Sequence, residues 1–106
     1  MFGKKKEVVD TPVKKASDRI VFAEMEDDDE LARDLVLKLK DNQPLIINFS
    51  NINEMATNKF IAFFSGATIA LDGKIVFLKT NVYLFIKRED LIDGSVKELI
   101  SSLNLK

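Results

Sequence analysis

The sequence predicts an α/β fold in which helices pack on one mixed sheet. Four short runs of β-branched and aromatic residues have the composition of strands, and three other segments repeat apolar residues at helical spacing. The chain has 106 residues, which is the size of one domain. The predicted order is β-α-β-α-β-β-α, and it requires at least the first two strands to be parallel.

The first strand and helix are predicted between residues 20 and 42. Residues 20–23 form a short apolar run, and residues 27–30 are all acidic. Leucines spaced four apart follow, so a helix begins at the acidic run and ends near residue 41. We interpret the acidic run as a solvated helix cap rather than a calcium site, because it lacks the ligand spacing and the glycine of an EF-hand loop.

The middle of the chain predicts a buried strand and a long helix. Residues 45–49 are a continuous apolar run entered through Pro44, as expected for a strand that is buried on both faces. Asn51 or Asn53 is positioned to cap a helix that runs from about residue 54 to residue 71 and stops at an Asp-Gly turn.

Two more strands and a terminal helix complete the predicted fold. The strands are residues 74–79 and 82–87, on either side of a Thr-Asn pair. Residues 87–90 carry charges that cancel, and we interpret them as an exposed strand end and turn. Ser95 is the predicted cap of an amphipathic helix that contains Val96.

Composition argues against most enzyme chemistry. The chain has no cysteine and no histidine, so it lacks thiol nucleophiles, the usual general base and the commonest ligand of transition metals. The net charge is 16 − 17 = −1, and the aromatic residues are not interleaved with basic ones, which disfavours nucleic acid as a partner. We therefore expect no enzyme, no catalytic residue, no cofactor and no metal site.

The N-terminal segment differs in composition from the rest. Residues 1–18 are basic, contain Pro12 and show no sustained apolar period, so we predict a flexible tail followed by a folded domain at residues 19–106. No apolar signal-peptide core follows the first lysines. The longest nearly uncharged apolar stretch, residues 60–71, is too short to cross a bilayer as a helix. A cytoplasmic protein is expected.

The second predicted helix is apolar around most of its circumference. Phe60, Phe63 and Phe64 fall on one face with Ala67, Ala70 and Leu71, and this face is predicted to cover the sheet. The opposite side carries Ala62, Ser65, Gly66 and Ile69, which are small or apolar. Because a helix that is apolar all round is usually buried all round, we predict a helix-mediated homodimer. The alternative is that the first helix covers this side and the glycine relieves crowding.

Three segments in order, residues 63–67, 70–73 and 82–85, resemble the SepF family of cell-division proteins. The resemblance extends over about residues 19–101. It implies a dimeric, non-enzymatic α/β sandwich without cofactors. It further implies a protein that binds the C-terminal tail of FtsZ, the tubulin-like division GTPase, and promotes or cross-links Z-ring filaments during septum formation, as a dimer or a higher polymer at the division site.

The resemblance also assigns residues to roles. Lys59 and Phe63 correspond to a basic and an aromatic position of the helix motif, so they are the candidate residues for binding the FtsZ tail. Gly66 and Gly73 match the family's glycines, and with Ala62 and Ile69 they are the candidate residues of a dimer or polymer interface. Family members usually begin with a membrane-binding amphipathic helix. Here only residues 1–6 resemble it, which leaves membrane contact through the tail open.

One other class of protein fits part of the pattern. An apolar strand followed by a loop and a helix also occurs in STAS-like regulatory modules, which bind other proteins. Those modules usually carry a phosphorylatable hydroxyl at the start of the helix, whereas residues 51–54 here are Asn-Ile-Asn-Glu. A STAS-like interaction module remains the alternative function.

Overall fold

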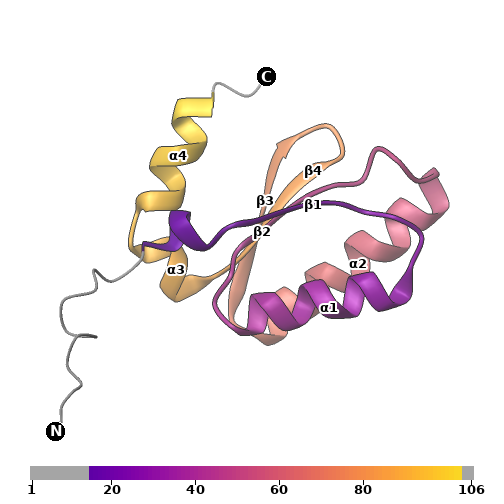
Figure 1. Cartoon of the computed structure of the whole chain (residues 1–106), viewed down its shortest axis with the longest axis horizontal. Coiled ribbons are helices and arrows are strands. Elements are labelled where there is room, and N and C mark those ends of the chain that lie inside the picture. Colours follow the sequence, from indigo (N-terminus) through magenta and orange to yellow (C-terminus); the bar gives the residue numbers. More distant parts are fainter. Residues whose placement is uncertain (1–14, 104–106) are drawn as a thin grey trace, which may run out of the picture.

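The structure is a computed structural model that describes residues 15–103 (Figure 1). A 3-10 helix, Ala16–Arg19, comes first. The elements that follow are β1 (Val21–Glu24), α1 (Asp29–Lys40), β2 (Leu45–Asn48), α2 (Glu54–Ala70), β3 (Gly73–Lys79), β4 (Val82–Lys87), α3 (Arg88–Ile92) and α4 (Ser95–Leu103). The predicted order of strands and helices is confirmed, with the first 3-10 helix and α3 as additions.

The four strands form one mixed sheet in the order β1-β2-β4-β3. β1 pairs with β2 in parallel, and β4 pairs with both β2 and β3 in antiparallel orientation. Figure 1 shows α1 and α2 side by side on one face of the sheet, with α4 and the 3-10 helix beyond the other face. The predicted parallel crossover through α1 is confirmed.

Aromatic residues form the core between the sheet and the first two helices. Phe49 at the end of β2, Phe64 of α2 and Phe85 of β4 are all fully buried, with ring centroids 5.4 to 6.4 Å apart. On α2 the buried residues follow the helical repeat: Ala56, Thr57, Phe60, Phe64 and Thr68. The prediction that Phe63 and Ala70 belong to this buried face is wrong, because both are exposed. The threonines take core positions instead, and the Thr68 hydroxyl donates to the Phe64 carbonyl at 2.6 Å.

A second, smaller core lies on the opposite face of the sheet. Val96 of α4 and Ala16 of the 3-10 helix are fully buried there against Ile46, Leu84 and Ile86. Residues 15–18 belong to the predicted tail, yet Ala16 is a core residue of the folded domain, so the predicted boundary lies too late in the chain. The rest of the predicted tail, residues 1–14, lies outside the described residues.

Two sequence interpretations near the end of β4 are corrected. Residues 88–92 form α3 rather than an exposed turn, and the Asp90 side chain is buried in an ion pair with Arg19 at 3.0 Å. Arg19 lies 71 residues earlier in the chain, so its pairing cannot be seen in local sequence. Ser95 is the first residue of α4 rather than its cap, and its hydroxyl donates to Asp93 at 2.7 Å.

The predicted helix starts and stops agree well with the structure. Asp28 caps α1 by accepting from the amides of Glu30 and Leu31, and Asn53 caps α2 by accepting from Ala56. In the turn after α2, Asp72 adopts the left-handed backbone conformation with φ 59°. Gly73 is the first residue of β3. Among the described residues, no helix combines the length and apolar character that a membrane crossing requires.

Asp93 joins the 3-10 helix Ala16–Arg19 to α4. Its carboxylate accepts from the amides of Ala16 and Ser95, both at 2.8 Å, and from the Ser95 hydroxyl. These donors, the Ala16 amide first, hold the pKa of Asp93 below its ordinary value of 3.8. The stabilisation they give is fully present above about pH 4, and it is lost as the pH falls through the lowered pKa of the folded state.

Asp93→Asn is expected to lower the free energy of unfolding by about 1 kcal/mol at pH 7, because an amide replaces the charged acceptor. The difference from wild type should shrink near pH 3, where the wild-type carboxyl also becomes protonated. Urea unfolding at both pH values measures this. Asp34→Asn, on the exposed side of α1, is the matched control. Equal pH dependence of Asp93→Asn and wild type would contradict the assignment.

Candidate partner-binding site

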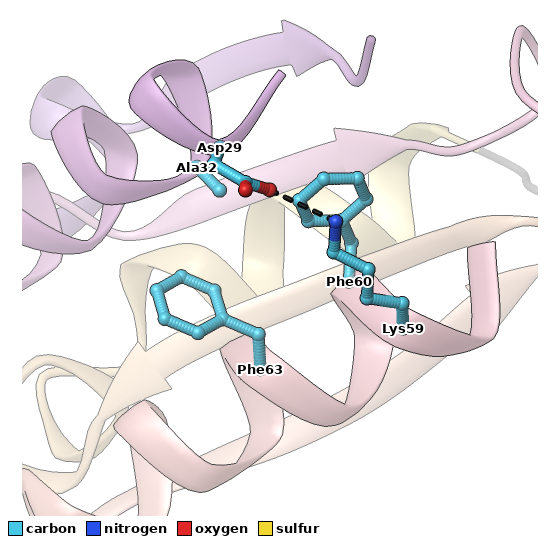
Figure 2. Close-up of a pocket in the computed structure, with 5 residues that line it drawn as sticks. All are labelled: Asp29, Ala32, Lys59, Phe60 and Phe63. Atoms are coloured by element: carbon cyan, nitrogen blue, oxygen red, sulfur yellow. Dashed lines mark ion pairs between the residues drawn. The ribbon is translucent and has the colours of Figure 1, made fainter. Parts of the chain in front are cut away.

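A hollow of about 330 Å³ opens between α1 and α2 on the helical side of the domain. Figure 2 shows its five lining residues: Asp29, Ala32, Lys59, Phe60 and Phe63. Helical spacing explains the grouping, because Asp29 and Ala32 lie one turn apart on α1, and Lys59 and Phe63 lie one turn apart on α2. Ala32 is buried between the helices, and its small side chain leaves room above it. The two residues predicted to bind a partner, Lys59 and Phe63, therefore lie in the same hollow.

The aromatic residues of the hollow have different roles. Phe60 is 1% exposed and belongs to the core, whereas Phe63 is 44% exposed. The Phe63 ring packs edge-on against Phe64, with centroids 5.4 Å apart, so the core holds one side of the ring while the other faces solvent. The possibility that Phe63 points wholly into the core is excluded by this exposure. An apolar side chain of a partner could contact the open side of the ring.

Lys59 forms an ion pair with Asp29. Its Nζ lies 2.9 Å from Asp29 Oδ1 and 4.6 Å from the centroid of the Phe60 ring. The hydrogen bond to Asp29 raises the pKa of Lys59, and the nearby charges of Asp29 and Asp27 act in the same direction. In Figure 2 the ion pair spans the two helices beside the hollow. The ammonium of Lys59, the basic candidate residue for partner binding, is thus already paired with a carboxylate of the same chain.

Asp29 is a site residue that no sequence pattern indicates. The acidic run 27–30 predicts a helix cap, and Asp28 does cap α1. Asp29 makes no capping hydrogen bond, and its side chain reaches across to α2 instead. The pairing depends on the packing of two helices, and neither the helical period nor the charge pattern of one segment could show it.

The outer side of α2 is open in a single subunit. Ala62 and Gly66 are exposed, Ile69 is 66% exposed and Met55, at the start of the same helix, is 82% exposed. A Cβ built on Gly66 would meet no atom of the described residues within 4 Å. The alternative that α1 covers this side, with the glycine relieving crowding, is therefore wrong. The homodimer itself stays a prediction.

Gly73 is required inside one subunit. A Cβ at this position would lie 2.5 Å from the Ile86 carbonyl oxygen and 2.8 Å from Thr68 Cγ2, both closer than side chains can approach. Close packing of β3 against β4 and the end of α2 is thus a sufficient reason for a glycine here. A contact of Gly73 with a second subunit remains a prediction.

The fold and the site define a class: a small α/β domain with a four-stranded mixed sheet and a helical face that exposes apolar residues suited to binding. The family model of the cell division protein SepF matches residues 20–88, which is more than half of the chain. The chain belongs to the SepF family. The match includes both helices of the hollow, the outer side of α2 and all four strands.

Individual relatives agree with the family model. The chain is 36% identical over 69 residues to the cell division protein SepF of Alkaliphilus oremlandii, covering 65% of this chain and 47% of the relative. The SepF protein of Exiguobacterium sibiricum is 27% identical over 93 residues, covering 88% of this chain and 56% of the relative. The chain thus spans about half the length of these curated relatives. Family membership links it to cell division and septation, and it replaces the STAS-like alternative.

The two glycines of the predicted interface should respond differently to alanine. Gly73→Ala is expected to lower the free energy of unfolding by roughly 1 to 3 kcal/mol, because the new Cβ displaces backbone at Ile86. Gly66→Ala fills open space in a helix and should leave a single subunit unchanged or more stable by about 0.5 to 1 kcal/mol. Urea unfolding at matched oligomeric state compares the two. Equal losses at both positions would show that the described packing is wrong.

Proposed function

We propose that this chain is a divisome protein that binds the C-terminal tail of FtsZ and promotes or cross-links Z-ring filaments during septum formation. The observation that carries the proposal is the hollow between α1 and α2, with a half-exposed Phe63 and the charged Lys59, in a chain of the SepF family. In this proposal the domain acts by binding at the cytoplasmic side of the division site, and it needs no cofactor.

The geometry of the hollow suits a short peptide better than a large rigid surface. The half-exposed Phe63 provides apolar contact above the buried Phe60 and Ala32, and the ammonium of Lys59 lies at the edge. Peptides that bind in grooves typically bury one or two apolar anchors and fix their orientation with a few polar contacts. A peptide segment with an apolar side chain for Phe63 and a carboxylate near Lys59 would match both features.

Self-association would allow one particle to bind two FtsZ tails. The outer side of α2 presents the small residues Ala62 and Gly66 together with the exposed Ile69, and close approach of two such helices would bury these apolar groups. Two linked tail sites raise the effective concentration of the second binding event, which is the physical basis of cross-linking. Ala62, Gly66 and Ile69 are the residues proposed for this contact, with Gly73 nearby in the sequence.

The dimer is tested by light scattering on the purified chain at micromolar concentration. Wild type should have about twice the mass of one chain. Gly66→Lys should reduce the mass to that of one folded chain, because an unpaired ammonium is costly to bury in a subunit contact but meets nothing in a single subunit. Ser101→Lys, on the exposed part of α4, is the control and should remain dimeric. A wild-type chain that is strictly monomeric would refute the dimer.

Tail binding is tested by titrating a peptide of the FtsZ C-terminal tail from the same organism. Phe63→Ala should weaken binding by about 2 to 4 kcal/mol if the ring anchors the peptide. Lys59→Ala should have a smaller effect and should mainly reduce the salt dependence of binding. Calorimetry gives the affinities, and thermal melts verify that each variant is folded.

Ile92→Ala is the control for Phe63→Ala. Ile92 is a large, exposed apolar residue of α3, outside both the hollow and the outer side of α2, so its truncation should leave tail affinity unchanged. A well-folded wild type that does not bind the peptide at all would overturn the assignment of FtsZ as the partner. Equal loss of binding in Phe63→Ala and in its control variant would show that the hollow is not the site.

A further inference from the structure

The Lys59 ammonium is already bound to a carboxylate before any partner arrives. Asp29 Oδ1 lies 2.9 Å from Lys59 Nζ, which is the distance of a charge-assisted hydrogen bond. Both side chains are accessible, with 55% of Lys59 and 81% of Asp29 exposed. A carboxylate brought by a partner would therefore meet the same ammonium from the solvent side, and it would meet the negative charge of Asp29 at the same time.

The position of Asp29 is not explained by the needs of its own helix. Asp28 provides the cap of α1 through hydrogen bonds to Glu30 and Leu31, and Asp29 makes none of these contacts. Glu30 supplies another negative charge in the first turn. Favourable interaction with the helix dipole is therefore available without the carboxylate of Asp29. What distinguishes Asp29 from its acidic neighbours is that it lines the hollow and contacts Lys59.

We propose that Asp29 determines the specificity of this site for acidic against neutral peptides. Its carboxylate occupies the position beside the Lys59 ammonium that a carboxylate of a bound peptide would take. The proposal rests on the function proposed above, and it adds the residue that controls it. When an acidic peptide binds, its carboxylate displaces that of Asp29, and Asp29 turns to solvent. Peptides without a carboxylate at that point leave the Asp29–Lys59 ion pair intact.

Displacement has an energetic consequence that can be measured. Exchange of the Asp29 carboxylate for a peptide carboxylate at Lys59 contributes little to the binding free energy, and the charge of Asp29 repels the peptide carboxylate. Asp29 therefore reduces the affinity for acidic peptides relative to neutral ones of the same shape. Because exposed ion pairs are weak, the effect of removing the Asp29 charge is expected to be a two- to fivefold change in affinity rather than a gain or loss of binding.

The experiment compares two peptides on four forms of the full chain. One peptide is the FtsZ tail with its own carboxylates, and the other has each Asp and Glu replaced by Asn and Gln. The protein forms are wild type, Asp29→Asn, Glu30→Gln and the double variant Asp29→Asn with Lys59→Gln. Glu30→Gln is the matched control, because it removes one negative charge from the same helical turn. The ion pair of Lys59 is with Asp29, not with Glu30.

Asp29→Asn is expected to tighten binding of the acidic peptide two- to fivefold and to leave the affinity of the neutral peptide unchanged. Glu30→Gln should change neither, and the gain should vanish in the double variant, since it acts through Lys59. Equal tightening of both peptides, an equal gain in Glu30→Gln, or no gain in Asp29→Asn would overturn the role of Asp29 while tail binding stands. If no form binds either peptide, the proposed function fails and this inference fails with it.

Discussion

The rotation of α2 about its own axis is the constraint on which the rest of the structure depends. The rings of Phe60 and Phe64 are fixed in the aromatic core with Phe49 and Phe85, so one side of the helix is committed to the sheet. Lys59 and Phe63 then have to lie at the α1 side, and Gly66 has to face outward. A dense core tolerates little change in such a rotation without leaving cavities or clashes. The candidate site is therefore a consequence of core packing as much as of its own residues.

Sequence patterns were sufficient for the elements whose signals are local. The apolar run that forms β2 and the leucine repeat of α1 each depend on residues within one segment, and the structure has both. The sequence also predicts a cap in the acidic run and another at Asn51 or Asn53, and in the structure these caps are Asp28 and Asn53. The long apolar helix was also predicted with nearly correct bounds. Its buried face was predicted less well, because Thr57 and Thr68 take core positions by bonding their hydroxyls to backbone carbonyls. A pattern based on hydrophobicity alone assigns such positions to Phe63 and Ala70 instead.

The features that could not be predicted are contacts between distant segments. Asp90 is buried because Arg19 reaches it across most of the chain, and Ala16 is buried because α4 returns over the outer face of the sheet. The Asp29–Lys59 pair likewise requires two helices to pack side by side. The family resemblance selected Lys59 and Phe63, which the structure places in one hollow, but it gave no sign that the ammonium has a partner within the chain. In physical terms, periodicity reports which side of an element is apolar, and it does not report what that side meets.

The packing of the 3-10 helix against α4 determines how the domain can be attached to anything else. Residues 16–19 and the start of α4 are held together by Asp93 and Ser95, on the face of the sheet opposite to α1 and α2 (Figure 1). A fluorescent protein or an affinity tag fused through a linker at either end of residues 15–103 thus joins the domain on the same side. Such a fusion leaves the helical layer accessible. Immobilising the domain through either end would leave the α1–α2 layer open to solution, which suits the domain to surface-based binding measurements.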